Sequence, residues 1–373
     1  MGEGSNRMVE KIDPKNKIRI MSAHEDCIPS SRFLMNKIEM FLHSNGYEVF
    51  KCDQPDECDI ILINAFGRTK ETVLDTRILI ERSVRDAAVK MVIILGYFSK
   101  KMEMDGRILT IGPKDLERFD QLFTHRIPMK HIPADPLDSR SFSMEHNFVP
   151  ISQGCNQNCS FCNINPAQRD IVSRSVDDII NDIQQGLRNG KKDFFLVGDD
   201  CGSYGVDLAT DLVSLIKEII HKCPEVKLKI SPFYPGHLIR LFPDLQESIA
   251  TGKIVYMNVP LQAGSKRILK LMNRNYNINV IKDIIKKIKN LAPSCRFGTH
   301  IIVNFPTETK EDFLSSLRLI ALFDDFLIFN YSDNSALPAG KIFPKVKRVE
   351  REKRLRVCRD LVKRLNRGKV VLG

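Results

Sequence analysis

The stretch ISQGCNQNCSFCNI, residues 151–164, contains the pattern that decides the fold of this chain. It places Cys155, Cys159 and Cys162 in a C-x3-C-x2-C spacing, directly after an apolar run that predicts a strand. Three thiolates on one short loop can bind three corners of a four-iron cluster and leave the fourth iron open. A structural zinc site needs a further Cys or His pair, and none follows within about 20 residues. The pattern therefore favours an iron-sulfur cluster over zinc.

From this loop toward the end of the chain, apolar runs alternate with segments of helical period. The apolar runs predict strands at 148–151, 194–198, 226–231, 254–259, 298–305 and 326–331. Helices are predicted at about 175–189, 207–222, 237–248, 277–291 and 309–322. Six βα units predict a partial (β/α)6 barrel, in which site residues gather at the C-terminal ends of the strands.

A second alternating region precedes the barrel and predicts a Rossmann-like parallel αβ domain. Strands are predicted at 18–21, 47–50, 59–65 and 90–97, with helices near 31–45 and 70–88. The pattern breaks at 125–147, where three prolines and no periodicity indicate a linker. The predicted organisation is a polar tail at 1–16, the αβ domain at 17–124, the linker at 125–147, the barrel at 148–342 and a basic C-terminal helix at 343–373.

Composition sets the broad class. Among 373 residues, 43% are hydrophobic and 28% charged, which is typical of a globular protein with sizeable cores. Because no run of 18 apolar residues occurs and the start lacks a secretory signal, we expect a cytoplasmic protein with no membrane partner. Much of the net charge of +11 lies in the predicted C-terminal helix, which either binds RNA or an acidic leader peptide or simply packs on the barrel.

The cysteine spacing, with the aromatic Phe161 before the third cysteine, resembles that of radical S-adenosylmethionine (SAM) enzymes. The resemblance implies that Cys155, Cys159 and Cys162 hold a [4Fe-4S] cluster and that Phe161 lies at the cofactor. In this superfamily the open iron chelates SAM, and an electron from a flavodoxin- or ferredoxin-type donor cleaves SAM to a 5'-deoxyadenosyl radical. The radical abstracts a hydrogen atom from the substrate.

The resemblance extends over most of residues 18–342 and is closest to the methylthiotransferase branch. It is carried by CNINPAQRDIVSRSVDDII at 162–180, LVGDDCGSYGVD at 196–207, VPLQAGSKRILKLMNRNY at 259–276, HIIVNFPTETKEDF at 300–313 and NYSDNSALPAGK at 330–341. It implies an enzyme that modifies a C–H bond of a peptide, nucleoside or small-molecule substrate.

Polar residues at the predicted strand ends are candidates for binding the SAM ammonium group and ribose hydroxyls. They are Asp199, Asp200, Ser231, Gln262 and Asn304. The alternative for each is a role in capping the following helix.

Three arginines and one cysteine complete the candidate site. Arg174 is predicted to bind the SAM carboxylate, and Arg169 and Arg274 a substrate phosphate, through bidentate contacts. Cys201 follows the second barrel strand and is predicted to touch substrate or an intermediate. Its alternative is an inert buried cysteine.

The N-terminal domain departs from the methylthiotransferase pattern, which has three further cysteines for a second cluster. Cys27 corresponds to the first of these, but Ala65 and Phe66 stand at the second position and Tyr97 at the third. We therefore predict one cluster. The alternative is a methylthiotransferase whose second cluster uses non-standard ligands, drawn from Cys52, Cys58 and Cys201.

Two further functions stay open. A cobalamin-dependent enzyme would need a D-x-H-x-x-G loop, but His24 is followed by Glu25 and Asp26 without the glycine. A non-catalytic relative would bind RNA or a protein partner through its basic residues. Relatives acting on transfer RNA usually carry a small C-terminal β-barrel, whereas this sequence stops at Gly373 after the basic segment, which weakens the expectation of an RNA substrate.

Overall fold

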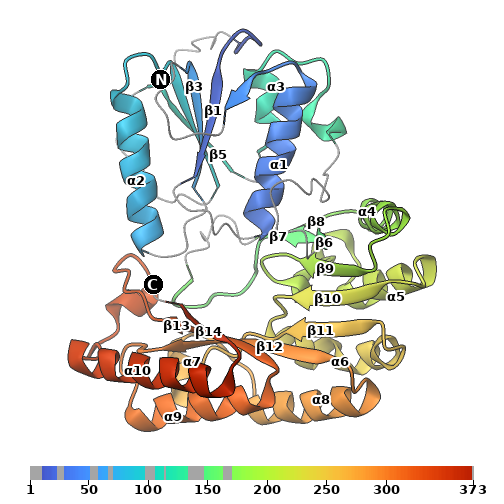
Figure 1. Ribbon diagram of the computed structural model, residues 1–373, viewed down its shortest axis with the longest axis vertical. Helices are drawn as coiled ribbons and strands as arrows, with labels where there is room; N and C mark the ends of the chain where they lie inside the picture. The colour runs from blue at the N-terminus through green and yellow to red at the C-terminus, as the bar shows by residue number, and fades with distance from the viewer. Residues whose placement is uncertain are drawn as a thin grey trace, which may run out of the picture. The chain divides into compact units, whose positions relative to one another are not determined.

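The computed structural model describes residues 11–22, 29–50, 58–65, 70–96, 106–112, 115–132, 147–162 and 170–371, without the side chains of 29–33 and 70–73. The chain divides into two compact units, Met1–Asp135 and Pro136–Gly373. Both contain parallel sheets with helical crossovers (Figure 1), which confirms the predicted α/β class. No described helix has the length and apolar character needed to cross a bilayer.

The N-terminal unit is built on a five-stranded parallel sheet in the order β2-β1-β3-β4-β5. Its strands are β1 (Ile18–Ser22), β2 (Val49–Phe50), β3 (Ile60–Asn64), β4 (Met91–Leu95) and β5 (Ile108–Ile111), and its helices are α1 (Pro29–Ser44), α2 (Lys70–Arg85), α3 (Arg118–Leu122) and the 3-10 turn η1 (Met129–His131). The strand order reverses after β2, so right-handed crossovers place α1 and α2 on opposite faces (Figure 1).

The N-terminal unit extends beyond its predicted limits at both ends. Ile12, assigned to the polar tail, is buried and pairs with Phe123. Met129 and Ile132, assigned to the linker, are buried in the core beneath α1. Sequence periodicity does not identify these residues, because each flanking segment packs on the core through single apolar side chains and not through a whole helix or strand.

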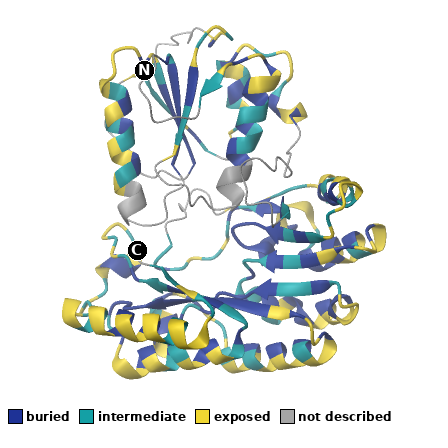
Figure 2. Cartoon of the chain, viewed as in Figure 1, coloured by how far each residue is buried: buried dark blue, intermediate teal, exposed yellow. Residues whose placement is uncertain are grey.

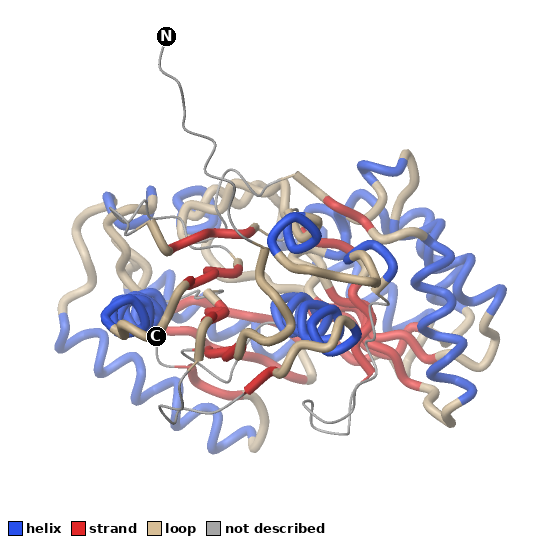
Figure 3. Tube along the Cα trace, turned by 90° about the horizontal axis from the view of Figure 1, so that it is seen from above, coloured by secondary structure: helices blue, strands red, loops and turns tan. Residues whose placement is uncertain are grey.

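The C-terminal unit is an open, partial barrel of seven parallel strands in the order β14-β13-β12-β11-β10-β9-β6 (Figure 3). The strands are β6 (Asn147–Pro150), β9 (Asp193–Val197), β10 (Lys227–Ser231), β11 (Ile254–Asn258), β12 (Arg296–Val303), β13 (Asp325–Asn330) and β14 (Lys369–Val371). A short antiparallel pair, β7 (Ser152–Gln153) and β8 (Val172–Ser173), brackets the cysteine-rich loop. Within the described residues no pairing joins β14 to β6, so the sheet stays open.

The barrel helices cover one face of this sheet. They are α4 (Val176–Arg188), α5 (Leu212–Lys222), α6 (Pro235–Ala250), α7 (Lys266–Leu271), α8 (Ile278–Leu291), α9 (Lys310–Leu319) and α10 (Arg348–Leu365), with 3-10 turns η3 (Cys201–Ser203), η4 (Val206–Leu208), η5 (Ile320–Leu322) and η6 (Pro338–Lys341). In α8, Ile281, Ile284, Ile285 and Ile288 recur at helical spacing and are buried, so this face packs on the strands (Figure 2). The predicted helices 175–189 and 277–291 correspond closely to α4 and α8.

The C-terminal segment differs from its predicted description. The basic helix is present as α10, but the residues after it form β14, which pairs with β13 and becomes the edge strand of the barrel sheet. Three residues after a glycine are too few to show a period of two, so the sequence does not reveal this strand. The segment 343–373 therefore belongs in part to the barrel.

The two faces of the barrel strands differ in character. Phe194 and Leu196 of β9 point toward the helices and are fully buried. On the opposite face, Phe195 stacks on Phe148 at 5.4 Å between ring centroids and meets Tyr256 edge-on at 5.9 Å. Further along the strands this second face becomes polar, and the candidate site begins there.

Candidate functional site

The cysteine-rich loop runs from Gly154 to Cys162 and is tied to the rest of the barrel at both ends. Gly154 has a φ of +86°, a conformation natural for glycine, and its N–H donates to the Asp199 carboxylate at 2.9 Å. The Ser160 N–H donates to the Met272 carbonyl at 3.0 Å, and the Ser160 carbonyl accepts from the Ala339 N–H at 2.9 Å. The loop is thus fixed by segments that follow β9, α7 and β13.

Within the described residues, none of the three loop cysteines forms a disulfide, and all three are partly buried. The buried Arg274 side chain donates from Nη1 to the Cys159 sulfur at 3.4 Å and from Nη2 to the Pro260 carbonyl at 2.7 Å. Burial raises the pKa of the Cys155 thiol, and the negative charge of Asp200 raises it further. A thiol in this setting becomes a thiolate when a cation binds it.

The loop offers three thiols, the number that a four-iron cluster with one open iron requires. Within the described part of the chain, no three His, Cys, Asp or Glu side chains are grouped to hold one metal ion. A zinc site requires its ligands to converge on one point. A cubane instead takes each thiolate on a different iron, so its ligands surround a larger body.

Three buried amide oxygens at the C-terminal ends of the strands have no hydrogen-bond partner among the described residues. They are Asn258 Oδ1, Gln262 Oε1 and Asn304 Oδ1. Buried polar atoms in native proteins are nearly always paired, so unpaired acceptors at one strand edge indicate a ligand with several donors. An ammonium group and ribose hydroxyls supply such donors.

The backbone at two of these residues supports the same interpretation. Gln262 has a φ of +67° and Asn304 a φ of +63°, in the left-handed region that non-glycine residues seldom adopt. Such conformations cluster at ligand sites, where the surrounding structure holds them. Gln262 is held between β12 residues, because its N–H donates to the His300 carbonyl at 2.7 Å and its carbonyl accepts from Ile302 at 2.8 Å.

The remaining strand-end candidates are engaged with protein groups. Ser231 Oγ accepts from Asn258 Nδ2 at 3.1 Å. Asp200 caps η3, accepts from the Ser203 hydroxyl at 2.8 Å and lies 2.8 Å from His237 Nδ1. Burial acts to raise the pKa of Asp200, but the hydrogen bonds from His237 and the Tyr234 N–H outweigh it and lower that pKa. Asp200 therefore has its capacity filled by the barrel itself, as the capping alternative predicts.

The other predicted site residues lie in different parts of the barrel unit. Phe161 is partly buried against apolar residues of α7 and β12. Arg174 donates to the Pro150 carbonyl at 2.9 Å and pairs with Asp182 at 2.7 Å, so its guanidinium binds the first strand and α4. Arg274 lies against the loop, as described above, while Arg169 lies outside the described residues.

Cys201 lies away from the polar face of the strands. The side chain is fully buried in the core on the helix-facing side of the sheet, and its thiol donates to the Leu196 carbonyl at 3.4 Å. Burial raises the pKa of this thiol, so it stays protonated. The chain turns into η3 directly after β9, which directs the side chain inward. This burial favours the alternative of an inert buried cysteine over the predicted contact with substrate.

Sequence reasoning missed several residues of the site. His300 Nε2 lies 3.1 Å from Asn258 Nδ2, and His300 packs edge-on against Phe329. His237 Nε2 lies 3.3 Å from Nε2 of Gln157 in the cysteine-rich loop. The strand-end rule that selected Ser231 also applies to Asn258, whereas the partnership of His237 with the loop depends on residues 80 positions apart.

Of the cysteine positions discussed for the N-terminal unit, Cys58 and Ala65 are described. Both are buried in the core beneath α2. Cys27, Cys52, Phe66, Tyr97 and His24 lie outside the described residues.

Comparison with known proteins gives a consistent picture. Residues 149–320 match the Radical SAM superfamily. The chain is 31% identical to the ribosomal protein uS12 methylthiotransferase RimO of Thermosipho melanesiensis over 69% of this chain and 61% of that protein. It is 27% identical to the tRNA-2-methylthio-N(6)-dimethylallyladenosine synthase of Pseudothermotoga lettingae over 88% of this chain and 81% of that protein. The match to the RimO protein thus spans about six tenths of its length.

Among solved structures, the fold is similar to that of the radical SAM methyltransferase TsrM from Kitasatospora setae, which was solved with cobalamin and a [4Fe-4S] cluster bound. The TM-score is 0.60 at 12% identity, covering 87% of this chain and 77% of TsrM. The cobalamin-dependent radical SAM enzyme OxsB gives a TM-score of 0.58 at 11% identity, covering 93% of this chain and 55% of OxsB. At such low identity these matches show the fold alone.

Proposed function

Because this chain is a radical SAM enzyme with relatives among the methylthiotransferases, we propose that Cys155, Cys159 and Cys162 hold its [4Fe-4S] cluster. The observation that carries the proposal is the position of three cysteines on one loop, fixed at the end of the sheet where unpaired amide oxygens gather. A reduced cluster of this kind supplies the electron that cleaves SAM to a 5'-deoxyadenosyl radical. The electron itself comes from a flavodoxin- or ferredoxin-type donor.

The chain's own residues bind and orient the cofactor. Gln262 and Asn304 present amide oxygens for the SAM ammonium group and ribose hydroxyls. Arg274 places a permanent positive charge beside Cys159, where it would stabilise the negative charge of a thiolate-bound cluster. Asn258 connects Ser231 to His300 across the polar face of the strands, and its free oxygen adds a third acceptor.

The proposed reaction modifies a C–H bond of a peptide, nucleoside or small-molecule substrate, with one cluster in the enzyme. A single cluster is supported by the burial of Cys58 in the core of the N-terminal unit and by Ala65, which has no thiol to offer as a ligand. A second candidate is sulfur transfer, which the names of the relatives favour. It requires a second cluster with non-standard ligands.

RNA or an acidic peptide is a proposed partner of α10. Its residues include Lys353, Arg356 and Arg359, whose side chains are exposed. Such a cationic surface attracts phosphates or carboxylates in a salt-dependent way. Binding that weakens steeply with added salt supports this partner class.

Anaerobic reconstitution of the full chain tests the proposal. We expect about four irons per chain, and release of 5'-deoxyadenosine when SAM and a reductant are added. About eight irons would favour the sulfur-transfer candidate with its second cluster. Four irons without any SAM cleavage would contradict radical chemistry and favour a binding role.

A further inference from the structure

The loop between β12 and α9, residues 304–309, is held in an unusual backbone conformation. Thr307 has a φ of +66°, and Asn304 at the start of the loop has a φ of +63°. Asparagine tolerates this region, but a β-branched threonine does so rarely. Residues in this conformation persist only where surrounding contacts hold the backbone in place, and two arginines supply such contacts to this loop.

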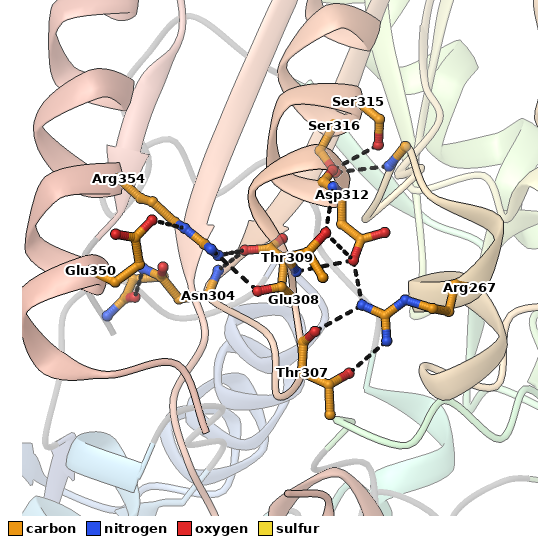
Figure 4. Close-up of polar contacts among 12 residues, drawn as sticks. Arg267, Asn304, Thr307, Glu308, Thr309, Asp312, Ser315, Ser316, Glu350 and Arg354 are labelled. Atoms are coloured by element: carbon orange, nitrogen blue, oxygen red, sulfur yellow. Dashed lines mark hydrogen bonds and ion pairs between the residues drawn. The ribbon is translucent and has the colours of Figure 1, made fainter. Parts of the chain in front are cut away.

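Glu308 and Arg354 supply the first of these contacts (Figure 4). The Glu308 Oε2 atom accepts from the Asn304 backbone N–H at 2.7 Å and from Arg354 Nη1 at 2.7 Å. Arg354 Nη2 also donates to the Glu308 carbonyl at 3.2 Å, and its Nε donates to Glu350 at 3.0 Å. One arginine of α10 therefore holds both the side chain and the backbone of the residue that fixes Asn304.

A second arginine holds the middle of the loop. Arg267 of α7 donates to the Thr307 hydroxyl at 2.9 Å and to the Thr307 carbonyl at 2.7 Å, and it pairs with Asp312 of α9 (Figure 4). The Thr307 N–H donates to the Pro344 carbonyl at 2.8 Å. The two arginines come from different helices and grip different residues, so their contributions can be separated by mutation.

The first contact leads directly to the candidate site. The Asn304 side chain donates from Nδ2 to Asn330 Oδ1 at 2.9 Å, while its buried Oδ1 has no partner among the described residues. The direction of this amide depends on the Asn304 backbone, which Glu308 holds. The Glu308 side chain is 0% exposed and that of Arg354 6%, so water cannot replace either partner without rearrangement.

We propose that Arg354 of the C-terminal helix is a positioning residue of the cofactor site, which acts through Glu308 to hold Asn304 in its left-handed conformation. This inference rests on the proposed function, since it assigns Asn304 Oδ1 to SAM. It makes α10 part of the site's support rather than only a basic appendage. Loss of Arg354 frees Glu308 to turn, and the Asn304 amide turns with the loop.

The test compares Arg354→Met with Arg348→Met in the reconstituted full chain. Arg348 lies on the same helix, but its side chain is 92% exposed and pairs with Glu352 four residues on. We expect Arg354→Met to raise the Kd for SAM about tenfold at unchanged iron content, and Arg348→Met to leave it unchanged. Arg354→Lys should restore part of the affinity, because lysine can pair with the Glu308 carboxylate as a point charge.

A second readout does not involve the cofactor. Hydrogen exchange of the Asn304 backbone N–H, which donates to Glu308, should be faster in Arg354→Met than in Arg348→Met when it is measured before cluster reconstitution. Lower thermal stability with unchanged SAM affinity and unchanged exchange would overturn the proposal and leave a purely structural ion pair. If Arg354→Met does not fold, Arg354→Lys takes its place in the test. A several-fold rise in its Kd for SAM would support the proposal, and an unchanged Kd would contradict it. Failure of the unmodified enzyme to bind SAM would instead refute the proposed function.

Discussion

The two sheets of this protein differ in what covers their faces. In the N-terminal unit helices lie on both faces, two separate cores form, and all five residues of β3 are buried. In the barrel unit the helices cover one face, and along β10 buried residues alternate with more exposed ones. A sheet covered on both sides favours apolar strands, although β1 and β3 each include one buried polar side chain, Arg19 and Asn64. A sheet with one face free can carry Asn258 and His300 within its strands, and the candidate site lies there.

The largest expected effect separates the cysteines of the two units. Cys159→Ala should abolish both the iron-sulfur absorption and the release of 5'-deoxyadenosine, because a loop with two thiolates cannot hold the cube. Cys58→Ala in the N-terminal unit serves as the matched change and should leave both intact. Absorption spectra of the two reconstituted variants measure the cluster, and product analysis measures the release of 5'-deoxyadenosine. Loss of iron in Cys58→Ala would mean that the N-terminal unit also holds a cluster.

A glycine in each unit sharpens the comparison of packing. A Cβ added at Gly264 would lie 2.3 Å from the Ser315 carbonyl oxygen, which is backbone and cannot turn aside. Gly264→Ala should therefore lower the free energy of unfolding by about 1–3 kcal/mol. Gly106 of the N-terminal unit has no described atom within 4 Å of such a Cβ, so Gly106→Ala should change the free energy of unfolding by less than about 0.5 kcal/mol. Denaturant unfolding curves compare the two, and equal effects would contradict the described packing.

A buried carboxyl predicts a pH dependence that belongs to the barrel unit. Burial raises the pKa of Glu308 to about 7, although Arg354 acts against this. Since the folded protein binds this proton more tightly than the unfolded chain, the contribution to stability is present below about pH 4.5 and is lost as the pH rises toward 7. The difference in unfolding free energy between the unmodified protein and Glu308→Gln should follow this trend. A difference independent of pH over this range would exclude the shift.

The smallest expected effect concerns helix ends. Asp211 caps α5 by accepting from the Ser214 N–H at 2.8 Å, so Asp211→Ala should cost about 1 kcal/mol. Glu117 precedes α3 of the N-terminal unit without a side-chain cap, and Glu117→Ala should have almost no effect. Urea midpoints of the two variants test this contrast. A clear loss in Glu117→Ala would show that its side chain has a role beyond the contacts seen.

Much of the fold could be predicted from the sequence because long apolar runs fix the strands. The run predicted at 254–259 is β11 at Ile254–Asn258, and the helix predicted at 277–291 is α8 at Ile278–Leu291. Short elements were not predicted: β14 has three residues and α7 six, so neither repeats its period twice.

The candidate site could be predicted only in part. The spacing of the loop cysteines and the strand-end rule led to Gln262 and Asn304, but the rule did not foresee that Cys201 turns into the core. The pairing of Glu308 with Arg354 joins residues 46 positions apart on a loop and a helix. Such a contact depends on how α10 packs against the barrel, and no local pattern reports it.

The most direct test of the central claim is the electron paramagnetic resonance spectrum of the reduced, reconstituted protein before and after SAM is added. If three cysteines hold a [4Fe-4S] cluster with one open iron, SAM should change the signal of the reduced cluster, and the Cys159→Ala variant should show no such signal. A cluster signal that SAM leaves unchanged, or purified protein that binds zinc and shows no cluster signal, would contradict the account.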